Sequence, residues 1–158
     1  MDPKANALLN CINQISFFDG FSSIEKESLL KKVGMFKKFD KKGVTIFSEA
    51  QKGSSMYVIL EGVVAITRAS FAHDKKEQVT LAKLKKGSVF GEIALLADHN
   101  RTTSAITESS LVIVMVIDKK TLDSFDLGVQ KVFHKQMIAT LVRRLDEMNK
   151  KLRNSMTQ

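Results

Sequence analysis

The chain has 158 residues, of which 44% are hydrophobic, so it is long enough to bury an apolar core as one domain spanning residues 1–158. No segment approaches the ~18 consecutive apolar residues of a membrane-spanning helix, and residues 1–6 lack the apolar run of a secretory signal. The single cysteine, Cys11, excludes an internal disulfide and a thiolate metal cluster, so we expect a cytoplasmic protein with no membrane span.

The formal net charge is +8, and the sequence pI is about 9.6. Such a charge fits either attraction to an anion, a nucleic acid or a membrane surface, or a surface of solvated lysines. The lysines occur as scattered pairs rather than as one basic stripe with interleaved aromatic residues: Lys31-Lys32, Lys37-Lys38, Lys41-Lys42, Lys75-Lys76, Lys85-Lys86 and Lys119-Lys120. We therefore favour the solvated surface and expect no direct contact with nucleic acid.

Helices are predicted at the N-terminus, within about residues 5–33. The first has one apolar face, formed by Leu8, Cys11, Ile12 and Ile15, and Cys11 is interpreted as a small core residue. Ser22 and Glu25 fit a capping box, in which each side chain bonds the other residue's free backbone N–H group. A second helix is therefore predicted over residues 23–33, with these side chains facing inward: Ile24, Leu29, Leu30 and Val33.

From about residue 35 to residue 118 the pattern changes to short apolar runs and alternation with period two. Strands are predicted at 35–39, 44–47, 56–60, 63–67, 78–84 and 111–117, and residues 72–77 are interpreted as a charged hairpin loop. Many short strands punctuated by glycines predict a mainly β fold, a barrel or a jelly roll. The three histidines are not spaced as metal ligands, and no catalytic arrangement of side chains is marked, so we expect neither a metal site nor an enzyme.

The segment Phe90-Gly91-Glu92-Ile93-Ala94-Leu95-Leu96, followed by Arg101-Thr102-Thr103-Ser104-Ala105, places two charges nine positions apart in an apolar region. Gly91 has no Cβ, and the residues after it favour a short helix, whose free N–H groups would form an anion site. The guanidinium of Arg101 suits a phosphate, and the carboxylate of Glu92 can accept from sugar hydroxyls. These features predict a small anionic ligand with a ribose; the alternative is a structural ion pair between Glu92 and Arg101.

This segment resembles the phosphate-binding cassette of cyclic nucleotide-binding domains, the family of the bacterial catabolite activator protein and of the regulatory domains of cyclic nucleotide-dependent kinases. Residues 53–64, with their paired glycines, resemble a strand pair of that family, and the resemblance covers about residues 15–150. It implies a β jelly roll at about 35–118 between N-terminal helices at about 5–33 and C-terminal helices at about 119–153. Two positions depart from the family pattern: Asn100 replaces a frequent proline, and Ser54 replaces a frequent acidic residue.

The resemblance implies a receptor for cyclic AMP or cyclic GMP that carries no cofactor and no metal. The residues that it implies as ligand contacts are Phe90, Gly91, Glu92, Ile93, Ala94, Leu95, Arg101, Thr102 and Thr103. A threonine after the cassette arginine resembles cyclic GMP-dependent kinases, and its hydroxyl can accept from the 2-amino group of guanine. Both nucleotides are therefore expected to bind, with a modest preference for cyclic GMP. The alternative function is a ligand-independent interaction or dimerisation module that retains the fold.

The last third of the chain is expected to be helical, with apolar residues that alternate by three and four over about two heptads: Ile138, Leu141, Leu145, Met148 and Leu152. Two interpretations stay open. The helix either lies on its own roll, or it forms a homodimer contact and a lid over the pocket, as in the resembled family. The candidate lid contacts are Arg144, Asp146 and Met148. The effector protein that would receive the signal is not identified.

Overall fold

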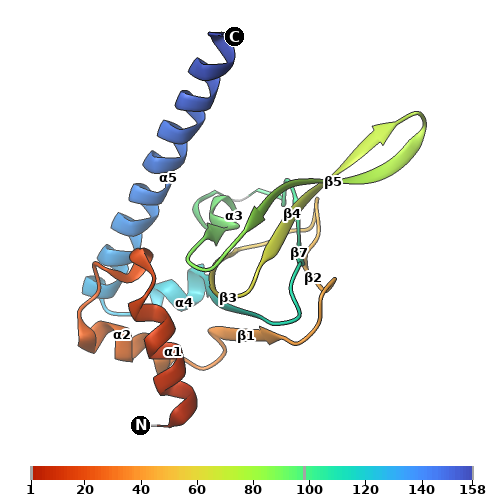
Figure 1. Cartoon of the computed structure of the whole chain (residues 1–158). Coiled ribbons are helices and arrows are strands. Elements are labelled where there is room, and N and C mark those ends of the chain that lie inside the picture. The colour runs from red at the N-terminus through yellow and green to blue at the C-terminus, as the bar shows by residue number, and fades with distance from the viewer. Residues whose placement is uncertain (1, 98, 158) are drawn as a thin grey trace.

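The computed structural model describes residues 2–97 and 99–157 (Figure 1). The helices are α1 (Pro3–Asn13), the 3-10 turn η1 (Ser16–Phe18), α2 (Ser23–Leu30), α3 (Glu92–Leu96), α4 (Lys119–Asp123) and α5 (Leu127–Met156). The strands are β1 (Phe36–Phe39), β2 (Thr45–Phe47), β3 (Ser55–Glu61), β4 (Val64–Ala72), β5 (Lys75–Leu84), β6 (Val89–Phe90), β7 (Ser104–Thr107) and β8 (Val112–Asp118).

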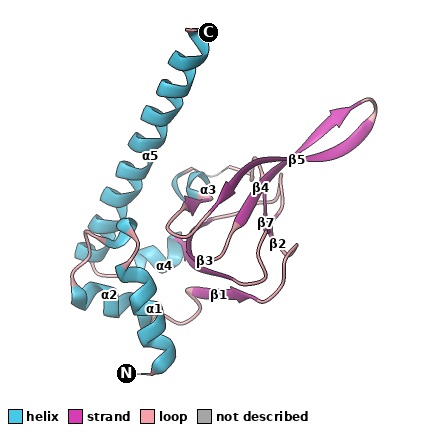
Figure 2. Ribbon diagram, in the orientation of Figure 1, coloured by secondary structure: helices cyan, strands magenta, loops and turns pink. Residues whose placement is uncertain are grey.

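The strands form two four-stranded antiparallel sheets, with the orders β1-β8-β3-β6 and β2-β7-β4-β5. Figure 2 shows the strands gathered into a roll, with the N-terminal helices and the lower part of α5 at one side. The fold is therefore mainly β with helical flanks, as the sequence predicts. Within residues 2–97 and 99–157, no helix is both long enough and apolar enough to span a membrane.

Strand β3 is buried on both faces, and this explains its unbroken apolar sequence. Met56, Val58 and Leu60 point toward the helices and join a large core with η1, α4 and α5. Tyr57 and Ile59 point the other way, into a smaller core between the two sheets. Successive strand residues face opposite sides, so one strand ties the helical layer to the roll.

The capping box at the start of α2 is present, because Ser22 and Glu25 each accept a hydrogen bond from the other's backbone N–H group. The predicted inward face of this helix is only partly correct. Leu29 is fully buried, whereas Ile24 is 80% exposed and Val33 lies beyond the helix, fully exposed. Ile24 precedes Leu29 by five residues, which places it about 140° around the helix from Leu29.

The predicted hairpin between β4 and β5 is present, but its loop is shorter than the expected 72–77. The strands pair as far as Ala72 and Lys75, so only His73 and Asp74 turn the chain. Both turn residues have positive φ, of 52° and 60°, which matches the twist of a two-residue hairpin. The hairpin projects from the roll (Figure 1).

Strands β6 and β7 were not predicted from the sequence. The first has only two residues, and the second, Ser104–Thr107, carries polar residues at both ends. Both flank the cassette, one directly before Gly91 and the other three positions after Arg101. The two charges are therefore held between paired strands of opposite sheets.

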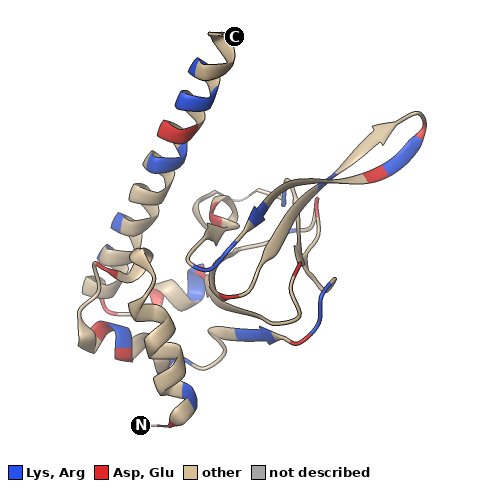
Figure 3. Cartoon of the chain, in the orientation of Figure 1, with Lys and Arg blue, Asp and Glu red and all other residues tan. Residues whose placement is uncertain are grey.

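Helix α5 begins at the cap residue Asp126, whose side chain accepts from the N–H group of Val129. Its first half packs on the protein, and the buried residues are Val129, Phe133, Met137 and Thr140. The ring of Phe133 lies 4.9 Å from that of Phe21 in an edge-on contact. Its second half extends past the roll (Figure 1), so only the first half lies on the chain's own core, and the homodimer contact stays a prediction. Figure 3 shows basic residues spread over helices and strands alike.

Candidate functional site

A cavity of about 260 Å³ opens where the β6–α3 segment meets the loop before β7. Its walls include the cassette residues Phe90, Gly91, Glu92, Ile93, Ala94, Arg101, Thr102 and Thr103. The cavity is also lined by Phe47, Ile66 and Leu84, which the sequence did not mark, and by Asn100, the position that departs from the family pattern. The cassette therefore forms one continuous surface, opposite an apolar wall contributed by β2, β4 and β5.

Glycine is required at position 91 because the backbone turns there in a left-handed conformation, at the edge of the cavity. The φ of Gly91 is +74°, in the left-handed region, and it caps the N-terminus of α3. A Cβ at this position would lie 2.8 Å from Nη1 of Arg101 and 3.1 Å from the carbonyl oxygen of Ser55. The glycine thus makes the turn and leaves room for the arginine beside it.

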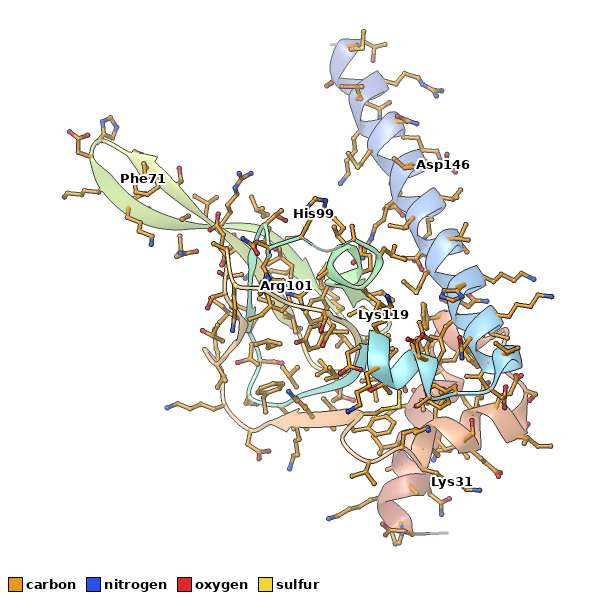
Figure 4. All side chains as sticks on the ribbon, turned by 180° about the vertical axis from the view of Figure 1, so that it is seen from behind. Lys31, Phe71, His99, Arg101, Lys119 and Asp146 are labelled. Carbon is orange, nitrogen blue, oxygen red and sulfur yellow. The ribbon has the colours of Figure 1, made fainter. Side chains whose placement is uncertain are left out.

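Arg101 is only 7% exposed. Its Nη1 donates to the carbonyl of Gly91 at 3.0 Å, and its Nη2 donates to the carbonyl of Ser55 at 2.7 Å. Its guanidinium carbon lies 4.1 Å from the centre of the Phe47 ring, a favourable cation–π distance. Figure 4 shows Arg101 inside the roll, well apart from Asp146 on α5.

The support for Arg101 comes from backbone and rings rather than from a carboxylate. Within the described residues, no Asp or Glu forms an ion pair with it, and its Nε has no hydrogen-bond partner. Burial lowers the pKa of Arg101, and the neighbouring Tyr57 and Glu92 oppose that shift. The resembled family often has an acidic residue at the position of Ser54. In this chain the carbonyl of the next residue, Ser55, supports Arg101 instead.

Glu92 is 7% exposed and has a partner that the sequence pattern did not indicate. Nη1 of Arg144, on α5, pairs with its carboxylate, and Nη2 of Arg144 donates to the carbonyl of Val89. The alternative of an ion pair between Glu92 and Arg101 is therefore wrong. Arg144 closes one side of the cavity, so α5 reaches the site directly.

Of the other predicted site residues, some line the cavity and some do not. Thr102 is exposed and Thr103 half-buried at the cavity wall. Leu95 does not line the cavity and instead packs against the large core. Asp146 and Met148 are exposed on α5 and do not line it either. Of the three candidate lid residues, the structure brings Arg144 alone to the cavity.

Two residues beside the site, Gly53 and Tyr57, were not predicted to contact the ligand, although both lie in the strand pair at residues 53–64. Tyr57 stacks on Phe90 with ring centres 5.0 Å apart, behind the cavity wall. A Cβ on Gly53 would lie 2.4 Å from Nε of Arg101, so that glycine leaves space for the guanidinium. The only sequence signal for Gly53 was its place in the paired-glycine strand pattern.

Comparison with known proteins agrees with this arrangement. Residues 37–125 match the family described as "Cyclic nucleotide-binding domain". Because that match covers more than half of the chain, the chain belongs to the cyclic nucleotide-binding domain family.

Particular relatives come from both kinases and transcriptional regulators. The chain is 34% identical over 82 residues to human cGMP-dependent protein kinase 2, which is 52% of this chain and 10% of the kinase. It is 31% identical over 111 residues to the CRP-like cAMP-activated global transcriptional regulator of Mycobacterium tuberculosis, which is 70% of this chain and 47% of the regulator. The chain thus spans a tenth of the length of the kinase and about half of the length of the regulator.

The fold is similar to that of a cyclic nucleotide-binding domain from Methylobacillus flagellatus. The TM-score is 0.74 at 18% identity, over 96% of this chain and 84% of that chain. At this identity the likeness concerns the fold, including the helical flanks and the roll of β strands.

Proposed function

We propose that this domain is a receptor for cyclic AMP or cyclic GMP and carries no catalytic activity of its own. The observation that carries the proposal is Arg101, a buried guanidinium at a cavity wall with no carboxylate partner in the described residues. A buried charge is costly unless it is paired, and a phosphate would supply the missing negative charge. The family and the two named relatives support the same ligand class.

In this proposal the phosphate contacts Arg101, and the ribose 2′-hydroxyl donates to the carboxylate of Glu92. The base lies toward the apolar wall, where Phe47, Ile66 and Leu84 offer a dry surface. Thr102 is exposed at the cavity wall, and in this proposal its hydroxyl accepts from the 2-amino group of guanine. Gly91, Ile93 and Ala94 contribute backbone and shape.

The signal would arise because Arg144 and the ribose require the same carboxylate. While Arg144 pairs with Glu92, α5 is tied to the cavity. A bound ribose displaces Arg144 and releases that tie. Ligand and helix are then coupled by competition, which gives the ligand the differential contact that a conformational change requires.

The exposed half of α5 is the surface that would transmit the signal. Exposed apolar residues recur along one side of the helix, from Ile138 near the end of the packed half into the exposed half: Ile138, Val142, Leu145, Met148, Leu152 and Met156. We propose that this side meets either an effector protein or a second copy of the chain. The half-buried Leu141 belongs to the face that packs inward.

The experiment is a titration of cyclic AMP and cyclic GMP against the purified chain and against Arg101→Leu. Removing one partner of a desolvated charge pair costs on the order of 2–5 kcal/mol, so the variant should lose at least about thirtyfold in affinity. Arg68→Leu, at an exposed arginine on β4, is the matched control and should bind as the unaltered chain does.

Thermal unfolding separates lost binding from lost folding. A nucleotide at 100 times its Kd should add about 2.7 kcal/mol of stability to the unaltered chain. Arg101→Leu should unfold cooperatively without that gain. A folded Arg101→Leu variant with unchanged affinity would show that the phosphate site is elsewhere, and no binding by the unaltered chain would favour the ligand-independent module.

A further inference from the structure

A second cavity, of about 550 Å³, lies on another part of the molecule. It is formed by residues 14–16 at the start of η1, the turn between β5 and β6, and α5. Its polar side chains are Gln14, Ser16, Lys86, Ser88 and Arg143, and it shares no residue with the cavity at Arg101. Three segments far apart in the sequence therefore meet around one polar space.

The charges around this cavity are of one sign. Lys86 and Arg143 both line it, and no aspartate or glutamate does. In the described part of the chain neither cation forms an ion pair with a carboxylate. Two cations that face one space repel each other, and an anion between them would relieve that repulsion.

The neutral groups around the cavity suit an oxyanion. Nζ of Lys86 donates to Oε1 of Gln14 at 2.6 Å, which leaves the amide N–H groups of Gln14 as donors. The hydroxyls of Ser16 and Ser88 add two further donors, and the guanidinium of Arg143 offers a planar fork. Several donors beside two cations are the features that a phosphate group requires.

The position of this cavity connects it to the nucleotide site. A smaller adjoining cavity of about 100 Å³ shares Ser16 and Arg143 and reaches Val89, whose carbonyl accepts from Arg144. Lys86 belongs to the roll and Arg143 to α5. A group that binds both therefore joins the roll to the helix one residue from Arg144.

We propose that this cavity is a second anion site, which binds a phosphate ion or a small phosphate ester and clamps α5 against the roll. The clamp favours the arrangement in which Arg144 pairs with Glu92. The next prediction rests on the proposed function. A phosphate-bearing anion should lower the affinity for the cyclic nucleotide without occupying the nucleotide cavity.

Direct binding is tested by titrating inorganic phosphate, and separately glycerol phosphate, at constant ionic strength. The Arg101→Leu background is used, because phosphate could otherwise bind Arg101. Saturable binding is expected, and Lys86→Gln or Arg143→Gln should each weaken it about tenfold, the value of a lost charge-assisted hydrogen bond. Lys150→Gln, at an exposed lysine of the same helix, is the control. Tighter binding of the ester would identify a phosphorylated compound as the ligand.

If Arg101→Leu does not fold, the same result is read from amide NMR shifts of the unaltered chain. Phosphate should then shift residues 14–16 and 86–88. Absence of saturable binding, or equal binding by both pocket variants and the Lys150→Gln control, overturns the second site.

Coupling is tested with cyclic GMP in the unaltered chain. Phosphate should lower the affinity for cyclic GMP, and cyclic GMP should lower the affinity for phosphate at this site by the same factor. Lys86→Gln should keep its phosphate-free cyclic GMP affinity and lose most of the phosphate effect. An equal effect in the unaltered chain and in Lys86→Gln would show simple competition at Arg101. That outcome overturns the clamp and leaves the receptor function intact, whereas failure of the receptor function appears as no cyclic GMP binding without phosphate.

Discussion

Glu92 is a single buried carboxylate with two competing partners, Arg144 within the chain and the ribose of the proposed ligand. Such a residue can report occupancy, because one contact must be lost when the other forms. Arg101 differs, since its carbonyl and ring contacts can persist when a phosphate arrives. In the proposed function the two cassette charges therefore have separate tasks: Arg101 would hold the ligand, and Glu92 would link it to α5.

This division predicts opposite effects for two variants. Arg144→Gln should raise cyclic nucleotide affinity by roughly 1 kcal/mol, about fivefold, because the ribose no longer competes with a cation. Glu92→Ala should lower affinity and abolish the preference for ribose over 2′-deoxyribose analogues. Both changes are measured by calorimetry with cyclic GMP and its 2′-deoxy analogue. An unchanged ribose preference in Glu92→Ala would remove Glu92 from the ribose role.

Thr102 tests the choice of base. Its exposed hydroxyl can accept from the 2-amino group of guanine, which adenine lacks, and one net hydrogen bond is worth about 0.5–1.5 kcal/mol. Thr102→Ala should therefore lower cyclic GMP affinity about 2- to 10-fold and leave cyclic AMP affinity nearly unchanged. Competition binding with both nucleotides measures these two affinities. Equal losses for the two would show that Thr102 contacts the phosphate or only shapes the strand start.

At the scale of elements, the short helix α4 joins the roll to the long helix α5, and its cap fixes where the chain turns. Asp118 ends β8 and caps α4, where its carboxylate accepts from the N–H group of Thr121 at 2.6 Å. That backbone hydrogen bond lowers the pKa of Asp118 below its ordinary value. Helix α4 leads directly to α5, so this cap helps to set where the long helix begins.

Asp118→Ala should destabilise the protein by about 1 kcal/mol, and Asp118→Asn by less, since asparagine also caps well. A carboxyl group with a lowered folded-state pKa contributes stability above its unfolded value, near pH 4, and loses it as the pH falls through the folded value. The stability difference between the unaltered chain and Asp118→Asn should therefore shrink below about pH 4. Urea unfolding at pH 7 and pH 3 measures it, and a constant difference would contradict the assigned cause.

For the whole molecule, α5 is the element with two environments along its length. Its first half is fixed by the aromatic cluster around Phe133, while its second half extends beyond the roll. Arg144 lies between them and makes the contacts to Glu92 and Val89. We therefore expect a change at this residue to reach the exposed half of the helix with little disturbance of the core.

Hydrogen exchange tests this expectation. Saturating cyclic GMP should speed amide exchange over residues 136–152, because the contacts of Arg144 to the cavity are lost. Residues 5–13 of α1, which do not line the cavity at Arg101, should exchange at the same rate with and without ligand. Identical exchange over residues 136–152 in both states would exclude α5 as the switch.

The sequence by itself determined the type of fold and the core of the site. Alternating apolar runs specify strands, because side chains on a strand face opposite sides with period two. The cassette could be found because its turn glycine, carboxylate and arginine lie within twelve residues, and the structure brings Glu92 and Arg101 to one cavity. These signals are local, so they need no knowledge of how distant segments pack.

Only the tertiary structure decided what the charged groups contact. Arg144 reaches Glu92 across 52 positions, a contact that depends on the phase and docking of α5. The carbonyl of Ser55 supports Arg101, and a backbone carbonyl carries no side-chain identity from which it could be predicted. The cavity between Lys86 and Arg143 likewise exists only because three separate segments meet. Contacts of this kind follow from packing, which local periodicity does not encode.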